Sequence, residues 1–275
     1  LASWDRPNGL NISRVATPLG VIGLIFESRP NVAADAGGLC LKSGNAVILR
    51  SGKDGLRSAT AIVNSLQDAL KLSGLPEECI QIVPSESREA ATMMLEGLNG
   101  SIDVIVPRGG KSLVAEVERS AKVPVFGHLE GICHIYVDEE ADEDKALSIC
   151  LNAKMRRTGI CGAVETILIN EKISPSFVPK LVASLFDAEC EIRCCEETVG
   201  FDDRAMLASE EDWSTEYLAP IVSVKSVAGI YEAIAHIEKY GTGHTESIIS
   251  ENKETQSIFT HSIDSAIVMI NASTQ

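Results

Sequence analysis

The sequence predicts an α/β protein made of open, twisted and mostly parallel sheets. Short apolar runs rich in β-branched residues alternate with segments of helical periodicity along most of the chain, which is typical of parallel strands joined by crossover helices. A length of 275 residues is more than a single hydrophobic core commonly organises, so two α/β domains are expected. With 45% hydrophobic and 23% charged residues, the composition is that of a folded globular chain.

The first part of the chain predicts two successive βαβ units. Pro30 favours a helix start, and Gly74 and Pro76 favour the end of a second helix. The expected strands are 21–26, 46–49, 80–83 and 102–106, and the expected helices are 30–42, 54–72, 88–98 and one that begins near Lys111.

After residue 126 the α/β pattern restarts, and we place the domain boundary so that the domains are 1–130 and 131–275. Residues 196–215 are polar and are expected to be irregular. The expected strands are 132–137, 164–169, 220–224, 246–250 and 266–270, and the expected helices are 141–156, 175–185, 227–238 and 253–260.

The charge of the chain excludes several classes of partner. Twenty-four Lys and Arg against 39 Asp and Glu give a net charge of −15, which repels nucleic acid and anionic membranes. No apolar run approaches the roughly 20 residues of a membrane helix, and the first residues lack the zones of a signal peptide. We therefore expect a soluble cytoplasmic protein that acts on a small molecule.

The eight cysteines show neither a Cys-x-x-Cys pair nor another paired spacing. This usage favours reduced thiols in a cytosolic protein, and no metal site is expected. Alternation with period two would put Cys190 and Cys194 on one face of a strand.

Cys161 has a setting that the other thiols lack. It lies between glycines in a loop that follows a helix and precedes a strand, close in sequence to Arg156 and Arg157. Exposure and nearby positive charge favour the thiolate, which is the form that a nucleophile needs. The alternative is an inert loop thiol. The two arginines and His128 are also candidate substrate ligands.

Four other ionisable residues surround the expected domain junction or follow it. Glu130 is a carboxylate that could act in general acid–base catalysis. His134 begins a strand and is expected to be a structural histidine, and His236 and His244 are expected to be polar groups without a chemical role.

A Gly-Lys-Ser sequence at the end of a strand resembles half of a P-loop. The other half is missing, because the P-loop needs a glycine where Ile105 stands. Two glycines before a helix can still bind a phosphate through backbone N–H groups and the helix dipole. The candidate phosphate-binding residues are Arg108, Gly109, Gly110, Lys111 and Ser112; the alternative is an ordinary tight turn.

Arg50 and Lys53 directly follow the strand 46–49. Open α/β sheets bind ligands at the carboxyl ends of their strands, and the planar guanidinium of arginine matches phosphate oxygens in pairs. This pair of cations could therefore bind a phosphate, although a solvated basic loop remains the alternative.

Several stretches resemble the aldehyde dehydrogenase superfamily, and they occur in the order seen there. The resemblance extends to the γ-glutamyl phosphate reductase family within it, for which the stretch 227–248 matches the signature at every defining position. The superfamily stretches are 18–25, 43–50, 129–131, Cys161 and 215–221, and those of the narrower family are 26–31, 106–111, 131–137 and 227–248.

This resemblance implies a fold of two α/β domains, with NADPH bound by 1–130 and catalysis in 131–275. It implies a step of proline biosynthesis, in which Cys161 attacks L-glutamyl 5-phosphate, phosphate leaves, and NADPH reduces the thioester to glutamate 5-semialdehyde. Arg50 and Lys53 would then contact the adenosine ribose and its 2′-phosphate, Gly109 to Ser112 the pyrophosphate, and Glu216 the nicotinamide ribose.

This chain also differs from the usual pattern of the superfamily at several positions. Ser28 stands where an asparagine usually binds the oxyanion, so Ser28 with the Cys161 N–H is the expected replacement. Glu130 matches a glutamate that activates water in hydrolysing relatives, a step that this reaction would not use. Family members extend beyond both ends of this chain, with 9–17 as an expected oligomerisation strand in a homo-oligomer.

Two other functions remain open at this stage. One is a hydrolysing NAD(P)-dependent aldehyde dehydrogenase, which would not depend on phosphate. The other is a nucleotide-binding fragment that binds the cofactor without turnover.

Overall fold

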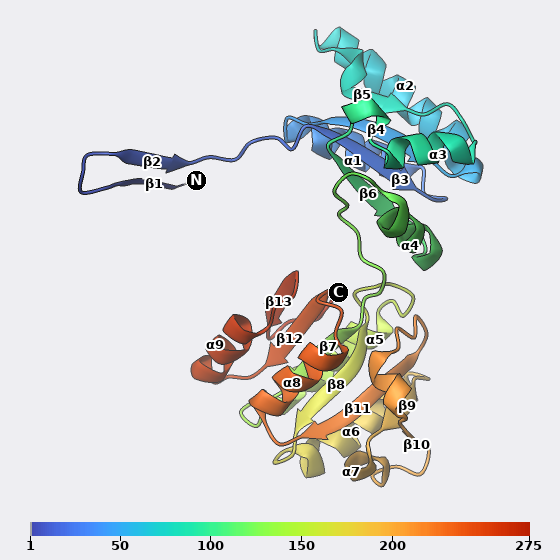
Figure 1. Cartoon of the computed structure of the whole chain (residues 1–275). Helices are drawn as coiled ribbons and strands as arrows, with labels where there is room; N and C mark the ends of the chain where they lie inside the picture. Colours follow the sequence, from blue (N-terminus) through green and yellow to red (C-terminus); the bar gives the residue numbers. More distant parts are fainter. Residues whose placement is uncertain (1) are drawn as a thin grey trace. The chain divides into compact units, whose positions relative to one another are not determined.

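The computed structural model describes residues 2–275, which form two compact units that meet between residues 129 and 130 (Figure 1). Both units are α/β, as the sequence predicts, and all strand pairs in their larger sheets are parallel. It stays a prediction that the first unit binds the cofactor and that the second unit carries the nucleophile.

The first unit contains a four-stranded sheet with the order β5-β4-β3-β6. Helices α1 and α2 cover the face that carries Phe26 and Val47, and α3 and α4 cover the face that carries Ile25 and Ile105. The elements are β3 (Val21–Phe26), α1 (Asn31–Lys42), β4 (Ala46–Ser51), η1 (Lys53–Gly55), α2 (Leu56–Leu72), η2 (Glu77–Cys79), β5 (Ile80–Ile82), α3 (Arg88–Leu95), η3 (Leu98–Gly100), β6 (Val104–Arg108) and α4 (Lys111–Ser120).

A two-stranded antiparallel hairpin, β1 (Ala2–Asp5) with β2 (Asn11–Arg14), precedes this sheet. The strand expected at 9–17 is thus shorter in the structure, and β1 was not among the expected strands. Both strands are rich in small polar residues and are largely exposed, so they lack the apolar alternation that identifies a half-buried strand. The oligomerisation role of this segment stays a prediction.

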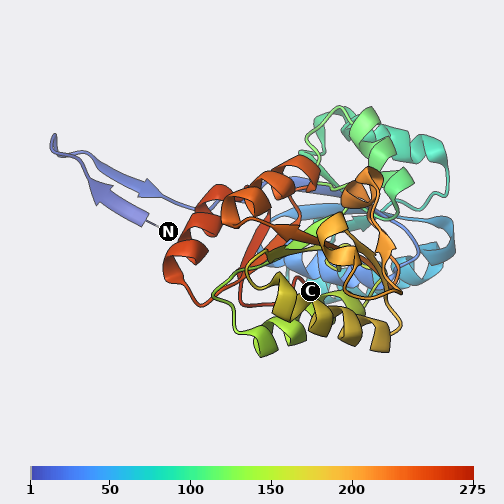
Figure 2. The same cartoon turned by 90° about the horizontal axis from the view of Figure 1, so that it is seen from below.

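The second unit contains a seven-stranded parallel sheet with the order β10-β9-β11-β8-β7-β12-β13. Helices lie on both of its faces, the yellow-green pair α5 and α6 opposite the orange-red pair α8 and α9 (Figure 2). The elements are β7 (Cys133–Val137), α5 (Glu143–Met155), β8 (Val164–Asn170), α6 (Ser174–Asp187), β9 (Glu191–Cys194), α7 (Glu196–Val199), β10 (Met206–Leu207), η4 (Glu210–Ser214), β11 (Ile221–Val227), α8 (Ile230–Tyr240), β12 (Thr245–Ile249), α9 (Lys253–Ser262) and β13 (Ile267–Ile270).

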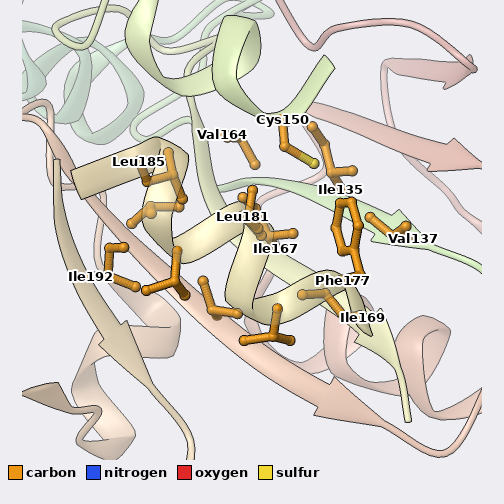
Figure 3. Packing of buried hydrophobic residues seen from close by; sticks show 14 of the residues in the cluster. Ile135, Val137, Cys150, Val164, Ile167, Ile169, Phe177, Leu181, Leu185 and Ile192 are labelled. Atoms are coloured by element: carbon orange, nitrogen blue, oxygen red, sulfur yellow. The ribbon is translucent and has the colours of Figure 1, made fainter. Parts of the chain in front are cut away.

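The larger core of this unit lies between the sheet and helices α5 and α6 (Figure 3). Phe177 and Leu181 of α6 pack against Ile135 and Ile167 of β7 and β8, and all four side chains are fully buried. Because β7 and β8 are covered on both faces, every residue of each strand is buried, as expected for central strands of a parallel sheet.

Two expectations for this half are wrong in detail. The stretch 196–215 is not wholly irregular, because it contains α7, the short strand β10 and the 3₁₀ helix η4. The helix expected at 227–238 begins only at Ile230, since Val227 completes β11. By contrast, Cys190 and Cys194 are both buried beside or within β9, as the alternation predicts.

None of the helices described over residues 2–275 combines the length and hydrophobicity that a bilayer span requires.

Candidate active site

Cys161 lies in the loop that joins α5 to β8, and its side chain is half-buried. Two glycines make room for this loop. A Cβ on Gly131 would overlap the carbonyl group of Cys161, and a Cβ on Gly162 would lie 3.1 Å from the carbonyl oxygen of Thr274. The chain just before β7 therefore packs directly against the backbone of Cys161.

Side chains from distant segments fix the residues just before β7. The Gly131 N–H donates to Oε1 of Glu216 at 2.9 Å, and the Ile132 N–H donates to Oγ1 of Thr242 at 3.0 Å. Glu216 and Thr242 thus connect the backbone that touches Cys161 to two separate loops of the second unit.

Cys133 connects the same strand to the nucleophile loop. Its buried Sγ donates to the carbonyl oxygen of Cys161 at 3.1 Å and lies 3.6 Å from Nδ1 of His244. Burial, together with the carboxylate of Glu246, strongly raises the pKa of Cys133. Cys133 is therefore a neutral thiol that serves as a hydrogen-bond donor.

A buried His134–Glu246 pair follows directly. Glu246 Oε2 accepts both the His134 N–H at 2.7 Å and the His134 Nδ1 hydrogen bond at 3.0 Å, and both side chains are fully buried. The ring of His236 meets that of His134 edge to face at a centroid distance of 5.6 Å. Burial, then the neighbouring His134, lowers the pKa of His236 to about 3, so His236 is neutral at pH 7.

Lys154 and Glu165 form a second buried pair, which the sequence analysis did not predict. Lys154 Nζ lies 2.5 Å from Glu165 Oε2, and the two side chains are 0% and 1% exposed. Burial raises the pKa of Glu165 to about 7, although Lys154 acts in the opposite direction. A glutamate among the apolar residues of strand β8, the only charged residue of that strand, is the sequence signal that could have indicated a buried partner.

The other predicted residues of this unit lie as follows. Glu130 is half-buried and directly precedes Gly131, so the chain carries it next to the Cys161 loop. Arg156 and Arg157 are exposed between the end of α5 and Cys161, and within residues 2–275 neither guanidinium forms an ion pair. Their predicted substrate contacts stay predictions.

In the first unit, cationic residues gather at the carboxyl edge of the sheet. Arg50 on β4 is level with Ile25 of β3, and Arg108 on β6 is level with Phe26. The chain leaves β3 for β4 on one side and returns to β6 on the other, and such a reversal of strand order is where open α/β sheets bind nucleotides.

Arg50 and Lys53 differ in how well they are held. Arg50 Nη2 donates weakly to the Ser87 carbonyl oxygen at 3.5 Å, and the buried Arg50 Nε has no partner among the described residues. Lys53 is exposed, and its Nζ lies 3.8 Å from Oε2 of Glu86. Arg50 therefore retains a hydrogen-bond donor that a ligand could use.

The Gly109–Gly110 turn leads into α4, and it contacts a carboxylate of the chain itself. The Gly110 N–H donates to Oε2 of Glu27 at 3.1 Å, and a Cβ on Gly109 would crowd the same carboxylate. Lys111 and Ser112 form the exposed first turn of the helix. The turn thus accommodates a carboxylate oxygen of the chain itself, and phosphate binding by this turn stays a prediction.

Ser28 and His128 also belong to the first unit. Ser28 is exposed and has a φ of 44°, a left-handed conformation that costs energy for a residue other than glycine. His128 is exposed near the end of the unit. A joint role of Ser28 and the Cys161 N–H, which belong to different units, stays a prediction.

Comparison with known proteins gives consistent results. The sequence model of the aldehyde dehydrogenase family matches residues 3–191. The chain is 57% identical over all its 275 residues to gamma-glutamyl phosphate reductase of Parvibaculum lavamentivorans, and 58% identical to that of Bartonella quintana, and it spans 65% and 66% of their lengths.

Among solved structures, gamma-glutamyl phosphate reductase of Thermotoga maritima matches the whole chain with a TM-score of 0.91 and 43% identity, over 66% of its own length. An acetylating aldehyde dehydrogenase of Geobacillus thermoglucosidasius, at 21% identity and a TM-score of 0.69, matches in fold over 94% of the chain.

Proposed function

The chain belongs to the aldehyde dehydrogenase family, and from this premise we propose that it reduces L-glutamyl 5-phosphate to L-glutamate 5-semialdehyde, a step of proline biosynthesis. The observation that carries the proposal is the half-buried Cys161 in a loop held by Gly131 and by the Cys133 hydrogen bond. Matches at 57–58% identity, over the whole of this chain and about two thirds of the relatives' length, to proteins of that name support the choice of substrate.

The family implies a nicotinamide cofactor, and the residues of the first unit fit one. The unpartnered Arg50 Nε can donate to a phosphate oxygen, and the Gly110 N–H, which donates to the Glu27 carboxylate, could donate to a phosphate oxygen in its place. Arg50 and Lys53 would hold the 2′-phosphate of NADPH, and the turn from Gly109 to Ser112 the pyrophosphate. The cofactor supplies a hydride to the acyl carbon.

The residues of the second unit then carry out the chemistry on the acyl group. Cys161 attacks the acyl carbon, phosphate leaves with the bonding electrons, and the thioester on Cys161 is the species that is reduced. Glu216 would orient the nicotinamide ribose, and its contact with Gly131 connects it to the Cys161 loop. Glu130 has no water to activate in this scheme.

The test is the reverse reaction. The protein is incubated with glutamate 5-semialdehyde, phosphate and NADP, and NADPH formation is measured. Formation that requires phosphate supports the proposal. Oxidation without phosphate would favour a hydrolysing aldehyde dehydrogenase, and NADPH binding without turnover would favour a binding fragment.

We expect Glu216→Gln to lower kcat by about tenfold or more and to change NADPH affinity by less. A nicotinamide that is held imprecisely loses its alignment with the acyl carbon, which slows hydride transfer, while most contacts that bind the cofactor remain. The amide can lose the charge-assisted hydrogen bond from the Gly131 N–H. Steady-state kinetics and calorimetric titration measure the two effects. Glu211→Gln, an exposed neighbour on η4, is the control; an unchanged kcat for Glu216→Gln would remove Glu216 from the site.

For cofactor choice, Arg50→Ala should weaken NADPH binding about 10- to 100-fold and leave NADH binding nearly unchanged. A charge-assisted contact with phosphate is worth roughly 1.5–3 kcal/mol, and NADH lacks that phosphate. Titration of both cofactors against wild type and Arg50→Ala measures this, with the exposed Arg57→Ala as the control. Equal losses for both cofactors would mean that Arg50 only shapes the pocket.

We also propose a cytoplasmic location and a homo-oligomer for the full-length protein. The β1–β2 hairpin supports the second point, because a two-stranded sheet with exposed strands is marginally stable by itself.

A further inference from the structure

The signature stretch 227–248 has no role in the scheme above, yet its end reaches the nucleophile. A ring nitrogen of His244 and Sγ of Cys161 lie within 4.8 Å of each other. We propose that His244 is the acid–base partner of Cys161, taking the thiol proton and stabilising the thiolate as an imidazolium. The inference rests on the proposed function, which makes Cys161 the nucleophile.

The position of His244 is fixed by its neighbours. Its Nδ1 lies 2.9 Å from Oγ1 of Thr245 and 3.6 Å from Sγ of Cys133, whose thiol in turn donates to the Cys161 carbonyl oxygen. Thr242, two residues earlier, accepts the Ile132 N–H. Because these contacts join the loop before β12 to the start of β7, the imidazole is held at a defined place beside the nucleophile loop.

Burial also suits this role. His244 and Cys161 are both half-buried, so substrate and solvent protons can reach them, whereas His134 and His236 of the same region are buried. Imidazole is the side chain whose charge changes most readily near neutral pH, so an accessible histidine suits proton exchange with a thiol.

Two carboxylates of this unit that could act as bases near Cys161 are engaged elsewhere. Glu246 accepts two hydrogen bonds from His134, and Glu216 accepts the Gly131 N–H. Cys133 remains a thiol because burial raises its pKa. Glu130, which precedes Gly131, is the one rival base that we test directly.

The proton and electron balance of the scheme is complete. The Sγ–H bond of Cys161 breaks, the proton passes to the imidazole, and sulfur keeps the electron pair with which it attacks the acyl carbon. The carbon–oxygen bond to phosphate breaks, and phosphate takes a proton from solvent. After hydride reduction of the thioester, the carbon–sulfur bond breaks as the aldehyde forms, and His244 returns its proton to sulfur.

The test is the rate at which iodoacetamide alkylates Cys161 at neutral pH, read by mass spectrometry of the Cys161 peptide. Since the thiolate is the reactive form, His244→Asn and His244→Ala should each slow alkylation at least tenfold, and free imidazole should restore the rate of His244→Ala. Asparagine keeps a polar atom near the Thr245 hydroxyl, so this variant guards against a loss of folding, which circular dichroism checks.

Two variants complete the design. His261→Asn, an exposed histidine of α9, should alkylate at the wild-type rate, and Glu130→Gln should do so as well. Wild-type rates in both His244 variants, a loss that imidazole does not restore, or an equal loss in Glu130→Gln or His261→Asn would overturn the proposal. Alkylation needs neither cofactor nor acyl phosphate, so an absence of reductase turnover would contradict the proposed function and leave this result intact.

Discussion

Replacement of Cys161 by alanine is expected to lower turnover by at least a thousandfold and to leave NADPH binding nearly unchanged. The thiol supplies the atom that forms the covalent intermediate, and no neighbouring group can replace it. The proposed cofactor contacts through Arg50 and the Gly109–Gly110 turn belong to the other unit, so they should not respond. Reductase kinetics and calorimetric titration of NADPH measure the two quantities.

Cys150→Ala is the matched control for this experiment. Cys150 lies in the core between α5 and the sheet, so its loss should cost about 1–2 kcal/mol of stability and leave turnover intact. Cys133→Ala is not an equivalent control, because its Sγ donates to the Cys161 carbonyl oxygen. Substantial residual turnover in Cys161→Ala would end the assignment of the nucleophile.

Strand and helix order could be predicted from the sequence because parallel sheets bury whole strands. The run that becomes β3 is an uninterrupted apolar sequence, those that become β7 and β8 are largely apolar, and all three strands are buried in the structure. The β1–β2 hairpin and the short elements within 196–215 could not be predicted in the same way, because their strands are short, polar or exposed.

The candidate site was predictable where one residue carries its own local signal. The glycine-bounded loop of Cys161 and the glycines before α4 are such cases, since glycines in the sequence indicate where another group can approach the backbone closely. The contacts of Glu27 with Gly110 and of Cys133 with Cys161 join residues 83 and 28 positions apart. Only the strand order brings such residues together, so His244 appeared to be a loop residue without a role.

Above pH 7, where Glu165 is ionised, removal of one partner of the buried Lys154–Glu165 pair is expected to destabilise the protein by about 3–5 kcal/mol, since the other charge is left without compensation. Lys154→Met keeps most of the side-chain volume and removes the charge. The double variant Lys154→Met/Glu165→Leu should cost clearly less than the sum of the two single changes. Denaturant unfolding of the four proteins measures the cycle, and additive losses would contradict a direct pair.

The same pair should make stability depend on pH in a defined direction. Burial raises the pKa of Glu165 from 4.5 to about 7 in the folded protein, so between these values the folded state holds a proton that the unfolded state has lost. The contribution of Glu165 to stability is therefore full below pH 4.5 and decreases as pH rises to about 7. Because Gln does not titrate, wild type should lose stability relative to Glu165→Gln as pH rises across this range. A constant difference between the two unfolding free energies would mean that Lys154 keeps Glu165 ionised throughout, with its pKa near or below the ordinary value.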